Sequence, residues 1–140
     1  MMKQLLLIAL LLLASSAWAA PNDDAAAADA RGDYAEVMRI IMPLAAKGEA
    51  WAQYNLGYMF AKGIGVVQDY VEAVRWYRLA AKQGHVDAQT NLGFMYGNGR
   101  GVPMDVVRAH MWFNLAAAKG NAGSVKNRDQ ATKMMTAANR

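Results

Sequence analysis

Apolar and small residues recur at helical spacing along the chain, and glycines interrupt this pattern at regular points. Between Ala50 and Ala61 the apolar residues follow a helical period, and the two glycines of segment 62–65 end that helix because glycine adopts positive φ without steric cost. A second helix is predicted after Asp69, whose carboxylate can cap its first turn, and the helix ends at Gly84. One face of this second helix carries residues at i, i+3, i+4 and i+7, namely Ala73, Trp76, Tyr77 and Ala80. The pattern predicts a helix–turn–helix unit with its tryptophan in the helix–helix core.

The helix–turn–helix pattern occurs twice, with a period of 36 residues. Segment 50–85 aligns without a gap with segment 86–121, and 17 of the 36 positions are identical, including Trp76 with Trp112. A period of this size is typical of a solenoid of supersecondary units. The same offset matches parts of segment 33–49, which reads as the second half of a preceding, degenerate repeat. We therefore predict an all-α fold, an α/α solenoid, whose 36-residue repeats span residues 33–121.

The segments outside the repeats have separate roles in this prediction. The N-terminus has the three regions of a signal peptide: a positive charge at Lys3, an uninterrupted apolar run from Leu5 to Leu13, and small residues around Trp18. We therefore expect cleavage after Ala19. Nine apolar residues are far fewer than the roughly 20 that a membrane span requires. The expected domains are a signal peptide (1–19), a linker or capping segment (20–32), the half repeat and two full repeats, and a C-terminal capping helix (122–140). The mature protein is expected to be periplasmic or secreted.

Composition narrows the classes of partner and chemistry. The chain has 15 basic and 11 acidic residues, a formal net charge of +4, and its basic residues are scattered rather than clustered. We therefore predict no binding of nucleic acid. There is no cysteine, which excludes a disulfide, a thiolate metal site and a thiol nucleophile. We further expect no membrane span in the mature chain, and a monomer.

Residues that could carry chemistry are few and separated. Ser124 has neither an activating base nor an oxyanion element nearby in the sequence, and His85 and His110 are too far apart for a local metal site. We expect His85 in an exposed turn between repeats and His110 on a helix surface. The glycine-rich segment 97–101 follows a helix rather than a strand, so it indicates a turn and not a phosphate loop. We predict no catalytic residue, no metal site and no cofactor.

The two copies of the first helix agree on one side and differ on the other. The shared side consists of residues identical in both copies, as repeated packing requires: Ala52, Gln53, Leu56, Gly57 and Met59. Gly57 and its counterpart Gly93 predict a close approach between helices, since a glycine within a helix costs about 1 kcal/mol and usually has a packing reason.

The differing stripe is the candidate binding surface. In the first copy it comprises Trp51, Tyr54, Tyr58 and Lys62, and in the second Asp87, Thr90, Phe94 and Asn98. Its aromatic residues are favoured as binding anchors, although packing against a neighbouring helix explains them equally well. Asn55 and Asn91 lie at the margin of the stripe and are identical, which also fits a structural hydrogen bond. The predicted binding residues are Trp51, Tyr54, Asn55, Tyr58, Thr90, Asn91 and Phe94.

The repeat resembles the Sel-one-like repeat, a relative of the tetratricopeptide repeats. The residues that carry the resemblance are segment 52–60, Gly63 to Val66, Asp69-Tyr70, Ala73, Trp76-Tyr77, Ala80-Ala81 and Gly84, together with their counterparts in the second copy. The resemblance implies a tetratricopeptide-like right-handed superhelix with a concave surface for protein binding. It therefore favours an exported scaffold or adaptor that binds a peptide or an envelope protein. The alternative is a cell-wall enzyme of the β-lactam-binding or β-lactamase type found among cysteine-rich relatives, which this chain without cysteine resembles less.

Overall fold

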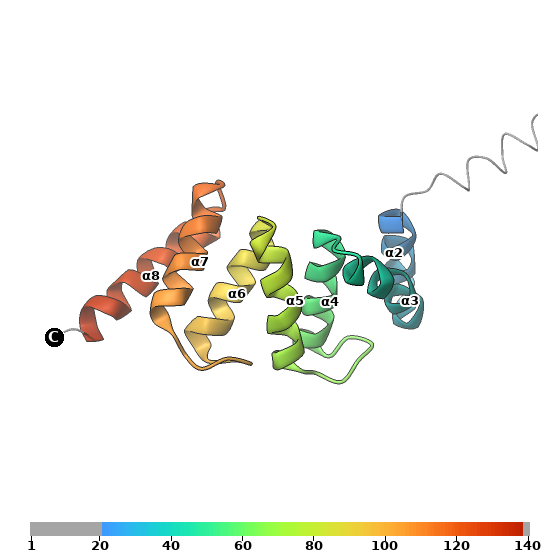
Figure 1. Ribbon diagram of the computed structural model, residues 1–140, viewed down its shortest axis with the longest axis horizontal. Coiled ribbons are helices and arrows are strands. Elements are labelled where there is room, and N and C mark those ends of the chain that lie inside the picture. Colours follow the sequence, from blue (N-terminus) through green and yellow to red (C-terminus); the bar gives the residue numbers. More distant parts are fainter. Residues whose placement is uncertain (1–20, 139–140) are drawn as a thin grey trace, which may run out of the picture. The chain divides into compact units, whose positions relative to one another are not determined.

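The computed structural model describes residues 21–138, which fold as helices joined by short turns (Figure 1). The predicted all-α class and solenoid arrangement are confirmed. The predicted signal peptide, residues 1–19, lies outside the described residues. The helices are α2 (Pro21–Ala30), α3 (Tyr34–Ala46), α4 (Ala50–Lys62), α5 (Tyr70–Lys82), α6 (Val86–Asn98), α7 (Val106–Ala118) and α8 (Ala122–Ala138).

The chain divides into two compact units, with the boundary between Ile40 and Ile41 inside α3. The described part of the first unit contains α2 and the first turns of α3. The Asp33 carboxylate accepts a hydrogen bond of 3.2 Å from the backbone N–H of Glu36 and so caps the start of α3. Such a cap satisfies one of the backbone donors that a helix leaves free at its first turn.

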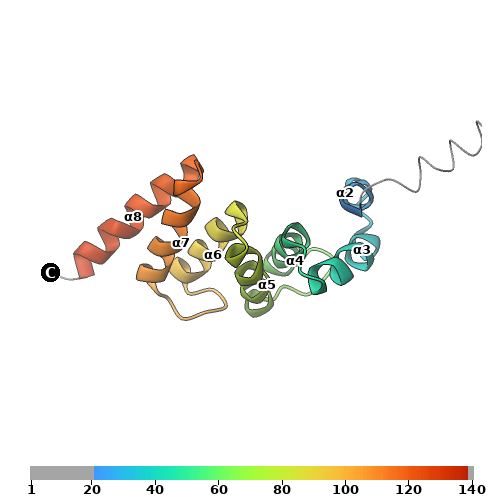
Figure 2. The ribbon, with the colours of Figure 1, turned by 45° about the horizontal axis from the view of Figure 1, so that its top comes forward.

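In the second unit, each helix from α4 to α8 packs against the next one along the chain (Figures 1 and 2). Helices α4, α6 and α8 begin at residues 50, 86 and 122, so their starts are 36 residues apart. Helices α5 and α7 are related by the same offset. We call α4, α6 and α8 the first helices and α5 and α7 the second helices. The segment predicted to be a C-terminal cap therefore contributes a helix in the register of a third first helix.

The predicted helix ends are confirmed by their backbone geometry. The Asp69 carboxylate accepts hydrogen bonds from the N–H groups of Val71 and Glu72, at 2.9 and 3.1 Å. At the other end of the first helices, Gly63 and Gly99 have φ values of 67° and 63°, in the left-handed region that glycine occupies most easily. Local sequence thus determines where these helices begin and end.

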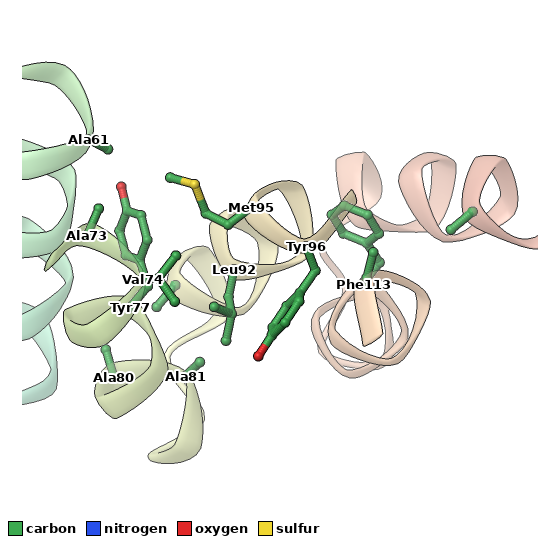
Figure 3. Packing of buried hydrophobic residues seen from close by; sticks show 13 residues of the cluster. Ala61, Ala73, Val74, Tyr77, Ala80, Ala81, Leu92, Met95, Tyr96 and Phe113 are labelled. Carbon is green, nitrogen blue, oxygen red and sulfur yellow. The ribbon is translucent and has the colours of Figure 1, made fainter. Parts of the chain in front are cut away.

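The core of the second unit includes the aromatic residue that follows Trp76 in one repeat and Trp112 in the next. Tyr77 is 1% exposed and Phe113 is 5% exposed, and both lie within the cluster of buried side chains (Figure 3). A Cβ atom added at Gly57 would lie 2.7 Å from the Tyr77 ring, and one at Gly93 would lie 2.6 Å from the Phe113 ring. The predicted close approach at both glycines is therefore confirmed: each glycine leaves room for an aromatic ring of the following helix.

The prediction that Trp76 and Trp112 form the helix–helix core is wrong by one position along each helix. The buried face of α5 is centred on Tyr77 and includes Ala73, Val74, Ala80 and Ala81. Trp76 is only half-buried, with the Arg75 guanidinium 4.8 Å from its ring centre, and Trp112 packs at the edge of the buried cluster. Successive residues on a helix are about 100° apart, so a face centred on Tyr77 leaves its neighbour at the margin.

Buried glutamines connect each repeat to the one before it. Gln53 and Gln89 are 4% and 3% exposed, and their side-chain amides donate to the carbonyls of Ala45 and Ala81, at 3.2 and 3.1 Å. The two acceptors are themselves 36 residues apart. A buried amide is expensive unless it is hydrogen-bonded, so this repeated bond fixes where α4 meets the end of α3 and where α6 meets the end of α5.

Candidate binding site between α4 and α6

A cavity of about 470 Å³ lies between the first helices α4 and α6, and we call it the α4–α6 cavity. Its walls also include the start of α5 and the loops that precede α5 and follow α6. The side chains most important for its chemistry are aromatic, cationic or amide-bearing: Tyr58, Lys62, Tyr70, Asn91, Phe94 and Arg100. A cavity of this volume is large enough to take side chains of a ligand.

Three of the predicted binding residues line this cavity. Tyr58 on α4 is 40% exposed, Phe94 on α6 is 43% exposed, and Asn91 lies one turn before Phe94. The large apolar surfaces of Tyr58 and Phe94 are therefore available to a partner. Aromatic side chains that are rigid and partly open are frequent anchors in protein interfaces.

The remaining predicted residues have other positions. Tyr54 is half-buried and packs against the core, with its ring 5.9 Å from Tyr77 and stacked at 4.7 Å on His85. The Thr90 hydroxyl lies 2.6 Å from the Ser124 hydroxyl on α8 and thus joins two first helices. Trp51 and Asn55 are half-buried and do not line the α4–α6 cavity. The stripe therefore combines cavity-lining residues with residues that hold neighbouring helices together.

The phenol groups of Tyr54 and Tyr77 have raised pKa values, chiefly because they are buried. Burial raises the pKa of Tyr77, whereas hydrogen bonding from the Asn91 side chain acts in the opposite direction. Burial, and then the negative charge of Asp87, also raise the pKa of Tyr54. Both phenols are therefore neutral at physiological pH and act as hydrogen-bonding groups rather than as bases.

Two cations stand at the walls of the cavity, each above an aromatic ring. The Lys62 ammonium lies 6.0 Å from the centre of the Tyr58 ring, and the Arg100 guanidinium lies 5.4 Å from that of Tyr70. Within residues 21–138, the ion pairs involve other basic residues: Arg39, Arg75, Arg108 and Arg128. Lys62 and Arg100 are thus positioned by rings and not neutralised by carboxylates in this part of the chain.

A second cavity of about 200 Å³ lies between α6, α7 and α8. Phe94 lines both cavities, and its ring meets the Phe113 ring edge-to-face with centres 5.2 Å apart. The other lining residues are mostly apolar and include Ala131 and Met134 of α8. The two cavities are therefore adjacent, with Phe94 in the wall that they share.

Sequence reasoning did not select the loop residues of the α4–α6 cavity. Gln68 lies in the loop before α5 and donates a 2.7 Å hydrogen bond to the Ala61 carbonyl, while Arg100 lies in the loop after α6. Neither loop residue belongs to a helix face, so helical periodicity carries no signal for them. Lys62 was part of the differing stripe, but only the fold places it in the lining of the same cavity as Arg100.

His85 is more enclosed than the sequence indicates. It is half-buried in the turn before α6, its ring stacks on Tyr54, and its Nδ1 accepts a 3.2 Å hydrogen bond from the Ala88 backbone N–H. The expectation of an exposed turn residue is therefore wrong. Burial lowers the pKa of His85 below its ordinary value of 6.5, against the opposing charge of Asp87. A neutral imidazole is also what the hydrogen bond to Nδ1 requires.

We expect acid to destabilise the protein through His85. The unfolded chain binds the proton more readily than the folded chain, so this contribution to stability is complete above pH 6.5 and falls as the pH drops through that value. The loss ends below the folded-state pKa. Thermal melting of the wild type and of His85→Asn between pH 7.5 and 5 tests this, because asparagine also caps helices but does not titrate. Parallel melting-temperature curves for the two proteins would contradict the assignment.

Paired helices in a 36-residue register, with an open cavity between successive first helices, define a helical-repeat protein. The chain belongs to the Sel1 repeat family, whose model matches residues 52–85 and 86–121. Sel1-repeat proteins are protein-interaction modules, and the fold is typically a non-enzymatic scaffold.

Two solved structures support the same assignment. The crystal structure of a Sel1 repeat protein from Oxalobacter formigenes is 39% identical, with a TM-score of 0.67, and the match covers 70% of this chain and 73% of that one. The crystal structure of c5321, a protective antigen present in uropathogenic Escherichia coli strains and displaying an SLR fold, is 33% identical with a TM-score of 0.77. That match covers 86% of this chain but only 27% of the antigen. No curated protein matches this sequence.

Residues 21–138 contain no helix that is both long and apolar enough to cross a membrane. The same part of the chain holds no group of three or more acidic or histidine side chains suited to a metal ion.

Proposed function

We propose that this protein is an exported protein–protein interaction module, a scaffold or adaptor that binds an extended peptide segment of an envelope protein in the α4–α6 cavity. The observation that carries the proposal is the presence of two open aromatic rings, Tyr58 and Phe94, in a cavity of about 470 Å³ between successive first helices. Membership of the Sel1 repeat family supports the general class of protein interaction.

The lining of the cavity suits a peptide. Tyr58 and Phe94 offer apolar surface on rigid helices, so a partner gains buried area with little loss of side-chain freedom. The amides of Asn91 and Asn98 also line the cavity and can each both donate and accept hydrogen bonds. An extended peptide exposes backbone donors and acceptors that need such partners.

Export forms part of the proposal and rests on the N-terminal sequence. Lys3, the apolar run from Leu5 to Leu13 and the small residues before Ala20 meet the requirements of a secretory signal. A partner from the cell envelope follows from that location. No specific observation favours the alternative of a cell-wall enzyme, and we do not propose it.

Phe94→Ala is expected to weaken peptide binding about thirtyfold, because a hot-spot aromatic typically contributes about 2 kcal/mol. The protein is purified from the extracytoplasmic fraction, and its N-terminal sequence is checked for a start at Ala20. The purified protein is then used to select binders from a displayed peptide library. Affinities of the selected peptides are then measured by fluorescence anisotropy.

The matched control is Met111→Ala. Met111 is 45% exposed on the second helix α7 and lies outside both cavities. The Met111→Ala substitution should leave the affinity for the peptide unchanged, and both variants should keep the helical circular dichroism spectrum. Equal losses in the two variants would show that binding is not located at the cavity. If the wild type and both variants hydrolysed nitrocefin, that result would instead favour an enzyme.

A further inference from the structure

We infer that the α4–α6 cavity selects an acidic side chain, Asp or Glu, within an extended peptide, through Lys62 and Arg100. The inference rests on the proposed function and specifies the chemistry of the partner at the same site. Its starting point is the charge of the lining. Lys62 and Arg100 are the charged side chains among the residues that line the cavity, and no carboxylate lies among them. The rest of the lining is aromatic, apolar or amide-bearing.

The structural needs of the repeat do not explain either cation. Lys62 lies in the last turn of α4, where a cation can interact favourably with the helix dipole. Its counterpart in the last turn of α6 is Asn98, so the repeat does not require a cation there. Arg100 corresponds to Ile64 in the first copy. Neither positive charge recurs at the equivalent position of the other copy, and both line the same cavity.

The positions of the two cations are prepared before a ligand binds. Each lies over an aromatic ring, Lys62 over Tyr58 and Arg100 over Tyr70. The loop that carries Arg100 is held by Gly101, which packs so closely on the start of α5 that a Cβ atom there would overlap the Tyr70 carbonyl group. A charge that is already in place loses less conformational freedom on binding. An acidic ligand would thus meet two positioned cations and neighbouring amides.

The adjacent cavity indicates a side chain within a continuing peptide rather than a C-terminal carboxylate. Phe94 lines the α4–α6 cavity and the mostly apolar cavity between α6, α7 and α8. A segment that crosses Phe94 can place its acidic side chain beside Lys62 and Arg100 and an apolar side chain near Met134. The preferred ligand is therefore an extended segment with an acidic residue followed or preceded by an apolar one.

The test uses peptides with acetylated N-termini and amidated C-termini, so that side chains carry their only carboxylates. Random octapeptides containing a single fixed Glu or Gln at a central position, with Asp and Glu omitted elsewhere, are compared on an array. For the wild type we expect the Glu peptides to bind about tenfold more tightly than their Gln partners, and this preference to decrease as salt is raised. The double variant Lys62→Gln/Arg100→Gln should lose the preference while it still binds Gln peptides.

The charge-matched control is Lys82→Gln/Lys126→Gln, which removes two exposed lysines that do not line the cavity. It should keep the preference for Glu, and a loss in this control would overturn the inference in favour of a general effect of net charge. Equal binding of Glu and Gln peptides by the wild type would overturn the inference but leave the proposed function intact, provided that Phe94→Ala weakens both. A preference seen only with free C-termini would also overturn it. Failure of every peptide to bind would contradict the proposed function itself.

Discussion

Replacing Tyr77 with alanine is expected to remove a large part of the stability of the second unit. The Tyr77 side chain is 1% exposed, contacts Gly57 on α4 and faces Tyr54, so its ring fills the space between the helices of one repeat. Truncation of a buried aromatic residue to alanine costs about 3–5 kcal/mol. Domains of this size have total stabilities of about 5–15 kcal/mol. We expect the melting temperature to fall by more than about 15 °C, or the cooperative transition to disappear.

Trp76→Ala is the control for this prediction. Trp76 precedes Tyr77, is larger and is half-buried, and its ring lies beneath Arg75. If burial rather than size determines the cost, Trp76→Ala should lower the melting temperature by less than half as much as Tyr77→Ala. Calorimetry on both variants measures the difference. A larger loss for Trp76→Ala would place the tryptophan in the core and contradict the register described above.

Gly101→Ala is expected to be the most damaging substitution of a glycine in a turn. Gly101 has a φ of +71°, which costs an alanine about 1–2 kcal/mol. An added Cβ would also overlap the backbone carbonyl of Tyr70, and neither backbone segment can move without disturbing the contact between the loop and α5. Overpacking of this kind typically costs a further 1–3 kcal/mol or so. We therefore expect a loss of about 2–5 kcal/mol in the free energy of unfolding, measured by urea denaturation.

Gly120→Ala separates the two contributions. Gly120 also has a positive φ, +88°, but no atom lies within 4 Å of the position that its Cβ would occupy. Its substitution should show the cost of the backbone conformation alone, about 1–2 kcal/mol. Losses of the same size at both glycines would mean that the loop after α6 does not pack closely on the start of α5.

Identity between the two repeat copies predicts which residues are packed in the core at some positions but not at others. Gly57 and Gly93 are identical because each faces an aromatic ring of the next helix. Leu79 and Leu115 are also identical, yet they are 42% and 43% exposed on the second helices. Identity between copies therefore does not imply burial. Glycines in a helix carry a specific steric meaning, whereas a leucine is compatible with either a core or a surface.

The sequence by itself determined the helices, their ends and the register of the repeat. These features depend on interactions among residues close in the chain: Asp69 bonds to N–H groups two and three residues later, and Gly63 adopts a positive φ within its own turn. A 36-residue period then requires equivalent packing in each copy, which the buried Gln53 and Gln89 illustrate with the same hydrogen bond. Local patterns and their repetition are sufficient for this level of structure.

Only the tertiary structure decided which aromatic residue fills the core and which residues share the cavity. Trp76 and Tyr77 differ by one position, and both fit the apolar face of an amphipathic helix, so the choice depends on where Gly57 on the neighbouring helix leaves room. Lys62 and Arg100 are 38 residues apart and come close to one cavity because two repeats stack. Periodicity describes a helix in relation to its own axis. The direction of its neighbours, and hence the composition of a site built from several helices, depends on packing between distant segments.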